Sequence, residues 1–220
     1  VRFVSGKRGW AVGANGLILS TDDGGTTWRV QKSDATANLR ALHFSDEKRG
    51  LIVGERGTML KTTDGGATWQ AVGGEGDVTL LGLAFTGAQE GWAVGEGGLI
   101  RHTADGGATW KTQDSGTRFW LEAVSFVNSK RGWAVGEAGT VVTTADAGAT
   151  WKTQESGTRR WLYGVAFVNE REGWAVGEEG LILRTTDGGE NWIVQISGTS
   201  SNLLSIHAPS ARKAWAVGVN

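Results

Sequence analysis

Hydrophobic and polar positions alternate over short stretches of the chain, and turn residues separate these stretches. In LEAVSFV (121–127), Val124 and Phe126 face one way and the small residues between them face the other. The same stretch of chain holds three more such segments: RGWAVG (131–136), TVVTT (140–144) and one that begins at Trp151. This alternation predicts half-buried β-strands, and no stretch shows the periodicity of a helix. We therefore expect an all-β fold.

The strand pattern repeats. GWAVG begins at residues 9, 91, 132 and 173, GLIVG at residue 50 and AWAVG at residue 214, so the period is 41 residues. A period of about 40–45 residues with four strands per unit is typical of a propeller blade. Small residues on one face of the first strand suit an innermost position, where blades crowd the axis. The pattern predicts a single-domain β-propeller of four-stranded antiparallel blades.

The ends of the chain do not complete a ring. Five full repeats cover about residues 1–32, 33–73, 74–114, 115–155 and 156–196, and residues 197–220 form a partial blade of two strands. A half-blade leaves an unpaired edge, which is an aggregation hazard. We expect the chain to be part of a six- or seven-bladed ring. The alternative is a homo-oligomer in which another copy completes the partial blade.

Composition excludes several classes of site and partner. The net charge is −1, which gives no reason to expect nucleic acid, and no apolar run is long enough for direct membrane insertion. The chain has no cysteine, so disulfides, thiol nucleophiles and cysteine-bound metals are excluded. The three histidines fall at positions that do not form a metal set. We expect no metal and no cofactor.

A T-x-D-x-G-x-T-W motif recurs in every full repeat. Its aspartates are Asp23, Asp64, Asp105, Asp146 and Asp187, and its tryptophans are Trp28, Trp69, Trp110, Trp151 and Trp192. An Asp beside Gly can close an Asx-turn by accepting backbone N–H groups. Carboxylates beside an aromatic ring are also typical of glycoside hydrolysis. Five equivalent copies cannot share one active centre, and Asp22 has no acidic counterpart in other repeats. The motif therefore predicts a structural turn lock.

The motif resembles the Asp-box, also called the bacterial neuraminidase repeat. In sialidases this box is structural, and catalysis requires an arginine cluster, a tyrosine nucleophile with its glutamate, and a further acid. Here Tyr163 is the only tyrosine, and the Arg-Ile-Pro motif of that family is absent. We expect no catalytic residues, and a sialidase-type glycosidase ranks only third among the functions considered.

The whole repeat resembles the photosystem II stability and assembly factor family more closely. The resemblance is carried by SGTRFWLEAVSFVNSKRGWAVGEAGTVVTTADAGATW (115–151) and SGTRRWLYGVAFVNEREGWAVGEEGLILRTTDGGENW (156–192). It implies a seven-bladed, non-enzymatic propeller that binds a protein partner, such as a membrane-protein subunit precursor. It also implies an extracytoplasmic location: the thylakoid lumen, or the periplasm or cell surface for relatives in bacteria without photosystems.

The most variable part of the repeat lies between the fourth strand of one blade and the first strand of the next. There the chain carries Arg118, Phe119, Trp120, Arg159, Arg160 and Trp161. Arg and Trp are enriched in binding hot spots, so these residues form the predicted protein-binding site. Alternatively, the two tryptophans pack between blades and Arg118 and Arg159 pair with loop glutamates.

Two further readings remain open from the sequence. Aromatic loop residues also stack on sugar rings, so the alternative function is a carbohydrate-binding propeller. The turns between first and second strands carry Lys-Arg pairs, a basic set that could serve a partner on the opposite face. The sequence does not choose between the two faces.

Overall fold

A computed structural model describes residues 1–73 and 76–219 of the chain, and strands dominate them. The first two sheets have the orders β1-β2-β3-β4 and β5-β6-β7-β8. Their strands are β1 (Arg2–Phe3), β2 (Gly9–Val12), β3 (Ile18–Thr21), β4 (Arg29–Gln31), β5 (Leu39–Phe44), β6 (Gly50–Gly54), β7 (Met59–Thr62) and β8 (Gln70–Ala71). The third sheet has the order β12-β11-β10-β9. It contains β9 (Leu80–Phe85), β10 (Gly91–Gly95), β11 (Ile100–Thr103) and β12 (Lys111–Gln113).

The later sheets continue this pattern, with orders β13-β14-β15-β16, β17-β18-β19-β20 and β21-β22. Their strands are β13 (Leu121–Phe126), β14 (Gly132–Gly136), β15 (Val141–Thr144), β16 (Lys152–Gln154), β17 (Leu162–Phe167), β18 (Gly173–Gly177), β19 (Ile182–Thr185), β20 (Ile193–Gln195), β21 (Leu203–Ser210) and β22 (Lys213–Gly218). The predicted all-β class and four-stranded antiparallel sheets are confirmed. Each sheet also lies within the residue range predicted for one blade.

Short 3-10 turns link the second and third strands of four sheets. They are η1 (Ala14–Gly16), η2 (Glu96–Gly98), η3 (Glu137–Gly139) and η4 (Glu178–Gly180). The second residue of each turn has a positive φ, and so does the glycine that ends the turn. In η3 these residues are Ala138 at 54° and Gly139 at 73°. A side chain at Gly139 would collide with the carbonyl oxygen of Thr158. This close approach brings the loop before β17 down onto η3.

The chain separates into two compact units. The first contains Val1–Ala93 with His102–Lys111, and the second contains Val94–Arg101 with Thr112–Asn220. The division passes through the third sheet. The single propeller domain expected from the sequence therefore stays a prediction, as does the number of blades in a complete ring.

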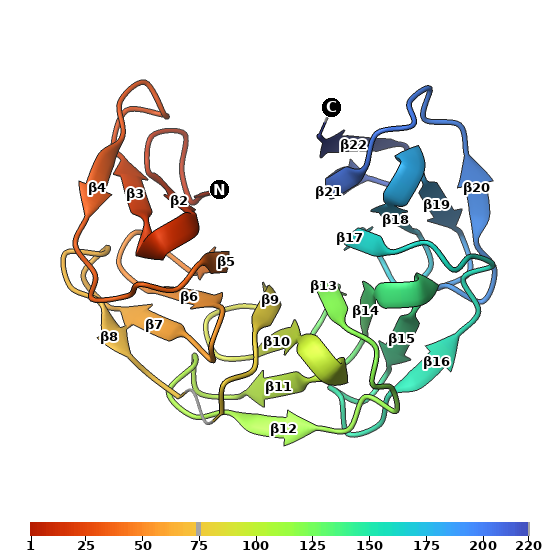
Figure 1. Cartoon of the computed structure of the whole chain (residues 1–220), viewed down its shortest axis with the longest axis horizontal. Helices are drawn as coiled ribbons and strands as arrows, with labels where there is room; N and C mark the ends of the chain where they lie inside the picture. Colours follow the sequence, from red (N-terminus) through yellow and green to blue (C-terminus); the bar gives the residue numbers. More distant parts are fainter. Residues whose placement is uncertain (74–75, 220) are drawn as a thin grey trace. The chain divides into compact units, whose positions relative to one another are not determined.

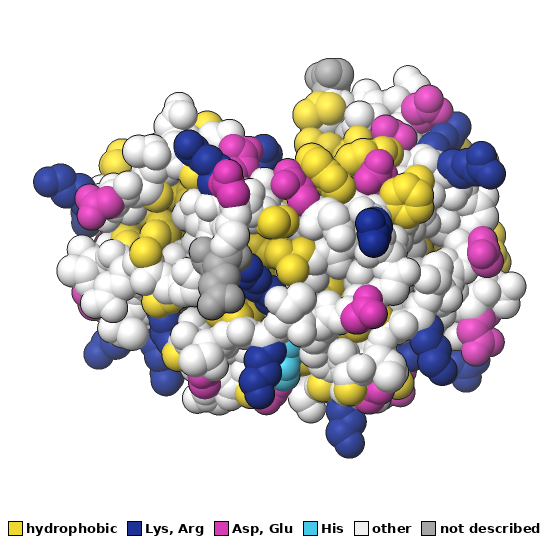
Figure 2. All heavy atoms as spheres, turned by 60° about the horizontal axis from the view of Figure 1, so that its bottom comes forward, with side chains coloured by type: hydrophobic (Ala, Val, Ile, Leu, Met, Phe, Trp, Pro, Cys, Tyr) yellow, Lys and Arg dark blue, Asp and Glu magenta, His cyan; other side chains and the backbone are white. Residues whose placement is uncertain are grey.

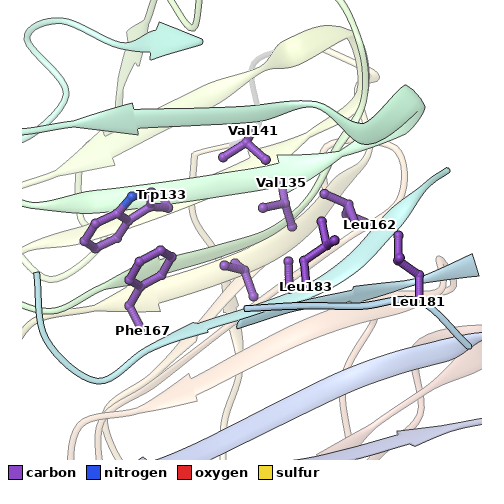
Figure 3. Close-up of a cluster of buried hydrophobic side chains, with 9 residues drawn as sticks. Trp133, Val135, Val141, Leu162, Phe167, Leu181 and Leu183 are labelled. Atoms are coloured by element: carbon purple, nitrogen blue, oxygen red, sulfur yellow. The ribbon is translucent and has the colours of Figure 1, made fainter. Parts of the chain in front are cut away.

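In the second unit, buried side chains fill the space between the fourth and fifth sheets. The cluster includes Trp133, Val135, Val141, Leu162, Phe167, Leu181 and Leu183 (Figure 3). Strands β13, β17 and β21 follow one another at the inner end of their sheets, as Figure 1 shows. In the first unit an equivalent cluster joins Ile18, Leu39, Ile52 and Leu60 from the first two sheets. In both units, one sheet thus buries apolar residues against the next sheet in the chain.

The β21–β22 sheet differs from the others because β22 has no third strand beside it in the described residues. Trp215 on β22 is 59% exposed, whereas its counterpart Trp133 is 0% exposed. Val217 is also exposed. No helix in residues 1–73 or 76–219 has the length and apolar character needed to cross a membrane.

Candidate functional site

The Asp motif forms a closed hydrogen-bond network in the turn between the third and fourth strands. In the fourth sheet the Thr144 hydroxyl donates to Asp146 Oδ1 at 2.8 Å and accepts the Gly148 N–H at 2.8 Å. Asp146 then accepts the Thr150 N–H at 2.8 Å and the Thr150 hydroxyl at 2.7 Å. The same arrangement recurs around Asp23, Asp64, Asp105 and Asp187, with Asn191 in place of Thr in the last copy.

The motif carboxylates are committed to this network. Hydrogen bonds from the Thr150 hydroxyl, the Thr150 N–H and the Thr144 hydroxyl hold the pKa of Asp146 at about 2. A carboxylate kept ionised by donors on both oxygens is poorly placed to act as a general acid or base. Asp22 stands apart from the motif and pairs with Arg8 and Arg29.

The structure shows what two positions of the turn require. Ala147, which stands where the other copies have the first glycine of the motif, has φ 63°, in the region that favours glycine. The position therefore needs a left-handed residue, and alanine occupies it with strain. Four of the five motif aspartates are exposed and Asp187 is half-buried, whereas Thr144 is the buried member of the network in the fourth sheet.

The motif tryptophans also tie the outer turn to the innermost strand. Trp192 meets the edge of Phe167 on β17 at 5.9 Å and 86°. The four other copies make the same edge-on contact, with centroids 6.0 to 6.4 Å apart. Edge-to-face pairs at this distance are favourable. The repeat thus holds the first and fourth strands of each sheet together from the side of the turn.

The predicted binding residues lie in two equivalent loops of the second unit, which precede β13 and β17. Reciprocal hydrogen bonds fix the end of each loop. The Trp120 N–H donates to Glu137 Oε2 at 3.1 Å, and the Glu137 N–H donates to the Trp120 carbonyl at 2.9 Å. Trp161 and Glu178 form the same pair at 2.9 and 3.0 Å. Side chains at Gly136 or Gly177 would collide with these carbonyls.

The loop residues gather into an aromatic surface. Trp120 and Trp161 meet edge to face with ring centroids 5.9 Å apart, and Trp161 lies 6.2 Å from Tyr163. The Tyr163 hydroxyl donates to Glu178 Oε1 at 3.5 Å. Trp120 is 38% exposed and Phe119 is 49% exposed. The tryptophans therefore pack against each other across two sheets and still present apolar area to solvent.

The three loop arginines have different surroundings. Arg160 pairs with Glu179 at 2.7 Å, whereas the sequence weighed such pairs for Arg118 and Arg159. Arg118 and Arg159 are exposed, and neither forms an ion pair with a described residue. On the face shown in Figure 2, Lys and Arg side chains are scattered among acidic ones and do not gather in one basic patch. The two free arginines thus stand beside the aromatic surface as local charges.

Sequence reasoning missed the residues that hold this surface in place. Glu137, Glu178 and Tyr163 were visible only as loop glutamates and a strand tyrosine. The recurrence of Glu137 and Glu178 directly after GWAVG was the available signal, whereas Tyr163 has no counterpart in the other repeats. Among residues 1–73 and 76–219, no group of three or more His, Cys, Asp or Glu side chains could hold a metal ion.

Comparison with known proteins identifies the family. The family model described as photosynthesis system II assembly factor YCF48 matches residues 30–119 and 109–201. The chain belongs to the YCF48 family. No curated protein matches the chain.

Solved structures similar to the chain are propellers of different kinds. A YCF48 structure with a bound D1 peptide is 23% identical, with a TM-score of 0.55, and the alignment covers 98% of this chain and 88% of that one. YCF48 from Cyanidioschyzon merolae is 21% identical, with a TM-score of 0.56 over 99% and 91% of the two chains. A GH74 xyloglucanase from Xanthomonas campestris is 13% identical, with a TM-score of 0.76 over 93% and 40%. These likenesses establish the β-propeller fold for this chain, a member of the YCF48 family.

Proposed function

We propose that the chain is a non-enzymatic scaffold that binds a polypeptide through the aromatic surface of its second unit. The observation that carries the proposal is the pair of equivalent loops whose Trp120 and Trp161 are anchored by Glu137 and Glu178. Loops fixed in this way lose little conformational freedom on binding. Exposed Phe119 and Trp120 offer the apolar area typical of interface hot spots.

Charge favours a partner segment that carries carboxylates. Arg118 and Arg159 are exposed beside the aromatic rings without an acidic partner among the described residues. A guanidinium binds a carboxylate through two parallel hydrogen bonds. The relative with a bound D1 peptide supports a peptide ligand, and family membership supports a role in assembling a photosystem II subunit precursor. Such a role places the protein outside the cytoplasm, in the thylakoid lumen, the periplasm or at the cell surface.

The absence of catalysis is part of the proposal. The motif carboxylates are held by hydroxyl and N–H donors inside their own turns. The likeness to GH74 enzymes, at 13% identity, is a likeness of fold alone. Aromatic loops can also hold sugar rings, so a glycan array belongs in the test.

The experiment measures the affinity of a fluorescent D1 peptide by anisotropy. We expect Arg118→Ala/Arg159→Ala to weaken binding about tenfold or more, since about 1.4 kcal/mol corresponds to a factor of ten. Arg160→Ala should have a smaller effect because Glu179 already neutralises it. The matched control, Lys130→Ala/Lys152→Ala, removes two exposed cations from the same unit and should bind normally.

Three results would overturn parts of this proposal. Equal affinity in the arginine variant and the control would remove these loops from the site. Failure of the folded wild-type chain to bind the D1 peptide would contradict the photosystem role. Strong glycan binding without peptide binding would favour the carbohydrate-binding alternative.

A further inference from the structure

One sheet lacks a tryptophan that the other sheets carry. The second strand reads GWAVG or AWAVG in five copies, but β6 reads GLIVG, so Leu51 stands where Trp10, Trp92 and Trp133 stand elsewhere. Where present in these three, the indole is fully buried. The first and fourth sheets, which carry Trp10 and Trp133, therefore provide an internal reference for what the second sheet lacks.

The indole normally fills a layered site between neighbouring sheets. Trp133 stacks on Phe167 (Figure 3), with ring centroids 3.5 Å apart, and donates its Nε1–H to the Gly188 carbonyl at 2.9 Å. The Arg131 guanidinium lies over the ring at 4.7 Å. Trp10 repeats this arrangement with a phenylalanine at 3.6 Å, a carbonyl at 3.1 Å and an arginine at 4.8 Å.

In the second sheet the surrounding layers remain but the ring is missing. Phe85, the counterpart of Phe167, is half-buried, whereas Phe167 is only 8% exposed. The Gly106 carbonyl stands in the place of the Gly188 carbonyl. Gly188 also receives a side-chain donor from Gln154 at 3.1 Å, but Val72 occupies that position here and has no such donor. Both groups that would serve the carbonyl are therefore absent.

A cavity of about 220 Å³ occupies this place in the first unit. Its lining includes Leu51, Phe85, Gly106, His43, Arg49 and Lys61. Arg49, the counterpart of Arg131, is turned to Asp46 at 2.6 Å. An apolar cavity of about 150 Å³ can hold benzene, so this one has room for an indole.

His43 covers part of the Phe85 face. The two rings stack with centroids 4.6 Å apart, and the buried Nε2 of His43 has no hydrogen-bond partner among the described residues. Burial, followed by the charge of Arg2, lowers the pKa of His43 to about 4, so the imidazole is neutral at pH 7. The corresponding residue in the fourth sheet is Ser125, whose small side chain leaves the face of Phe167 to Trp133. His43 thus competes with a ring for that face.

We propose that this cavity binds a planar aromatic ring with an N–H donor, of the indole class, from outside the chain. The ring stacks on Phe85 as the His43 imidazole turns aside, and its N–H donates to the Gly106 carbonyl. Arg49 can leave Asp46 and cover the outer face, as Arg131 does over Trp133. The ligand thereby replaces the side chain that Leu51 does not provide.

The test uses 5-fluoroindole, followed by 19F line broadening, and N-acetyl-tryptophanamide, followed by saturation transfer. We expect Leu51→Trp to abolish binding and to raise the melting temperature, because the new side chain fills the cavity. If that ring is too crowded, His43→Ser/Leu51→Trp copies the Ser125 and Trp133 pair and should do the same. Leu51→Ile keeps the cavity and should retain affinity within about threefold, while His43→Ser should bind more tightly.

Binding of both probes would show that the site accepts a tryptophan side chain, and binding of 5-fluoroindole alone would restrict it to small free rings. A wild-type protein that binds neither probe at millimolar concentration would overturn the proposal. So would a folded Leu51→Trp variant that binds as well as the wild type. None of these outcomes depends on the aromatic surface of the second unit.

Discussion

At the scale of single residues, the turn motif depends on the threonine that stands two residues before the aspartate in the chain. Thr144 is 2% exposed, and its hydroxyl accepts the N–H groups of Gly148 and Asp146 while donating to the Asp146 carboxylate. A buried hydroxyl with three partners leaves unpaired donors when it is removed. The exposed carboxylate can exchange its partners for water.

Thr144→Val should therefore lower the free energy of unfolding by about 1–3 kcal/mol, the usual range for a buried group left without a partner. Thr150→Val is the matched control, because Thr150 is exposed in the same turn and its hydroxyl serves only Asp146. Chemical denaturation of both variants makes the comparison. Equal losses in the two would show that burial of the hydroxyl does not decide the stability of the turn.

Much of this scale could be predicted from the sequence, because a fixed 41-residue period separates the repeated Asp23 from the unrepeated Asp22. The left-handed state of Ala147 could not, since alanine rarely adopts it. The sequence also did not reveal which loop arginine pairs with a glutamate. Arg159 and Arg160 are adjacent in the chain, and only the packing of the loop shows that Arg160 reaches Glu179.

At the scale of elements, the turns of the different sheets share a dependence on pH, because their aspartates have similarly lowered pKa values. Hydrogen bonds lower the pKa of Asp23, Asp64, Asp146 and Asp187 from 3.8 to about 2. A carboxyl whose pKa is lower in the folded state stabilises the fold above its ordinary pKa. That contribution is lost as the pH falls from about 4 through 2.

We expect the melting temperature to fall between pH 4 and pH 2, and the fall to be smaller in Asp146→Asn, which lacks one of these titrating groups. Thermal melts at closely spaced pH values measure it. Glu155→Gln, an exposed acid outside the turns, should keep the wild-type profile. A wild-type melting temperature that stays constant across this window would contradict the stabilising role of the motif carboxylates.

The edge of β22 is the element that sets this chain apart from a row of complete sheets. Trp215 and Val217 lie exposed on it, two residues apart and so on one side of the strand. An exposed apolar edge strand is a template for pairing with another chain. The homo-oligomer considered from the sequence stays a prediction, and this edge is where it would form.

Val217→Lys should reduce self-association of the 220-residue chain, because a charge on the edge opposes strand pairing. Light scattering after size-exclusion chromatography gives the mass of each species. Val194→Lys, which places the same charge on exposed β20, is the control and should leave the mass unchanged. A wild-type protein that is monomeric at all concentrations would end the oligomer prediction.

At the scale of the molecule, the repeat defines the fold and the deviations from it define the candidate sites. The sequence predicts four-stranded antiparallel sheets because period and strand alternation agree over five copies. The two sites arise where copies differ: loops with Trp120 and Trp161 in one unit, and Leu51 in the other. The cavity at Leu51 could not be read from sequence alone, because only the contacts of Trp10 and Trp133 in the structure reveal what the indole normally touches.

The central claim is that a partner polypeptide binds the two anchored loops of the second unit. Hydrogen exchange of the chain with and without saturating D1 peptide tests it most directly, since bound loops become protected. The account predicts protection within residues 115–121 and 156–163 and little change in the turns at 128–131 and 169–172, which lie at the other end of the same sheets. Protection confined to those turns, or no protection anywhere, would contradict the claim.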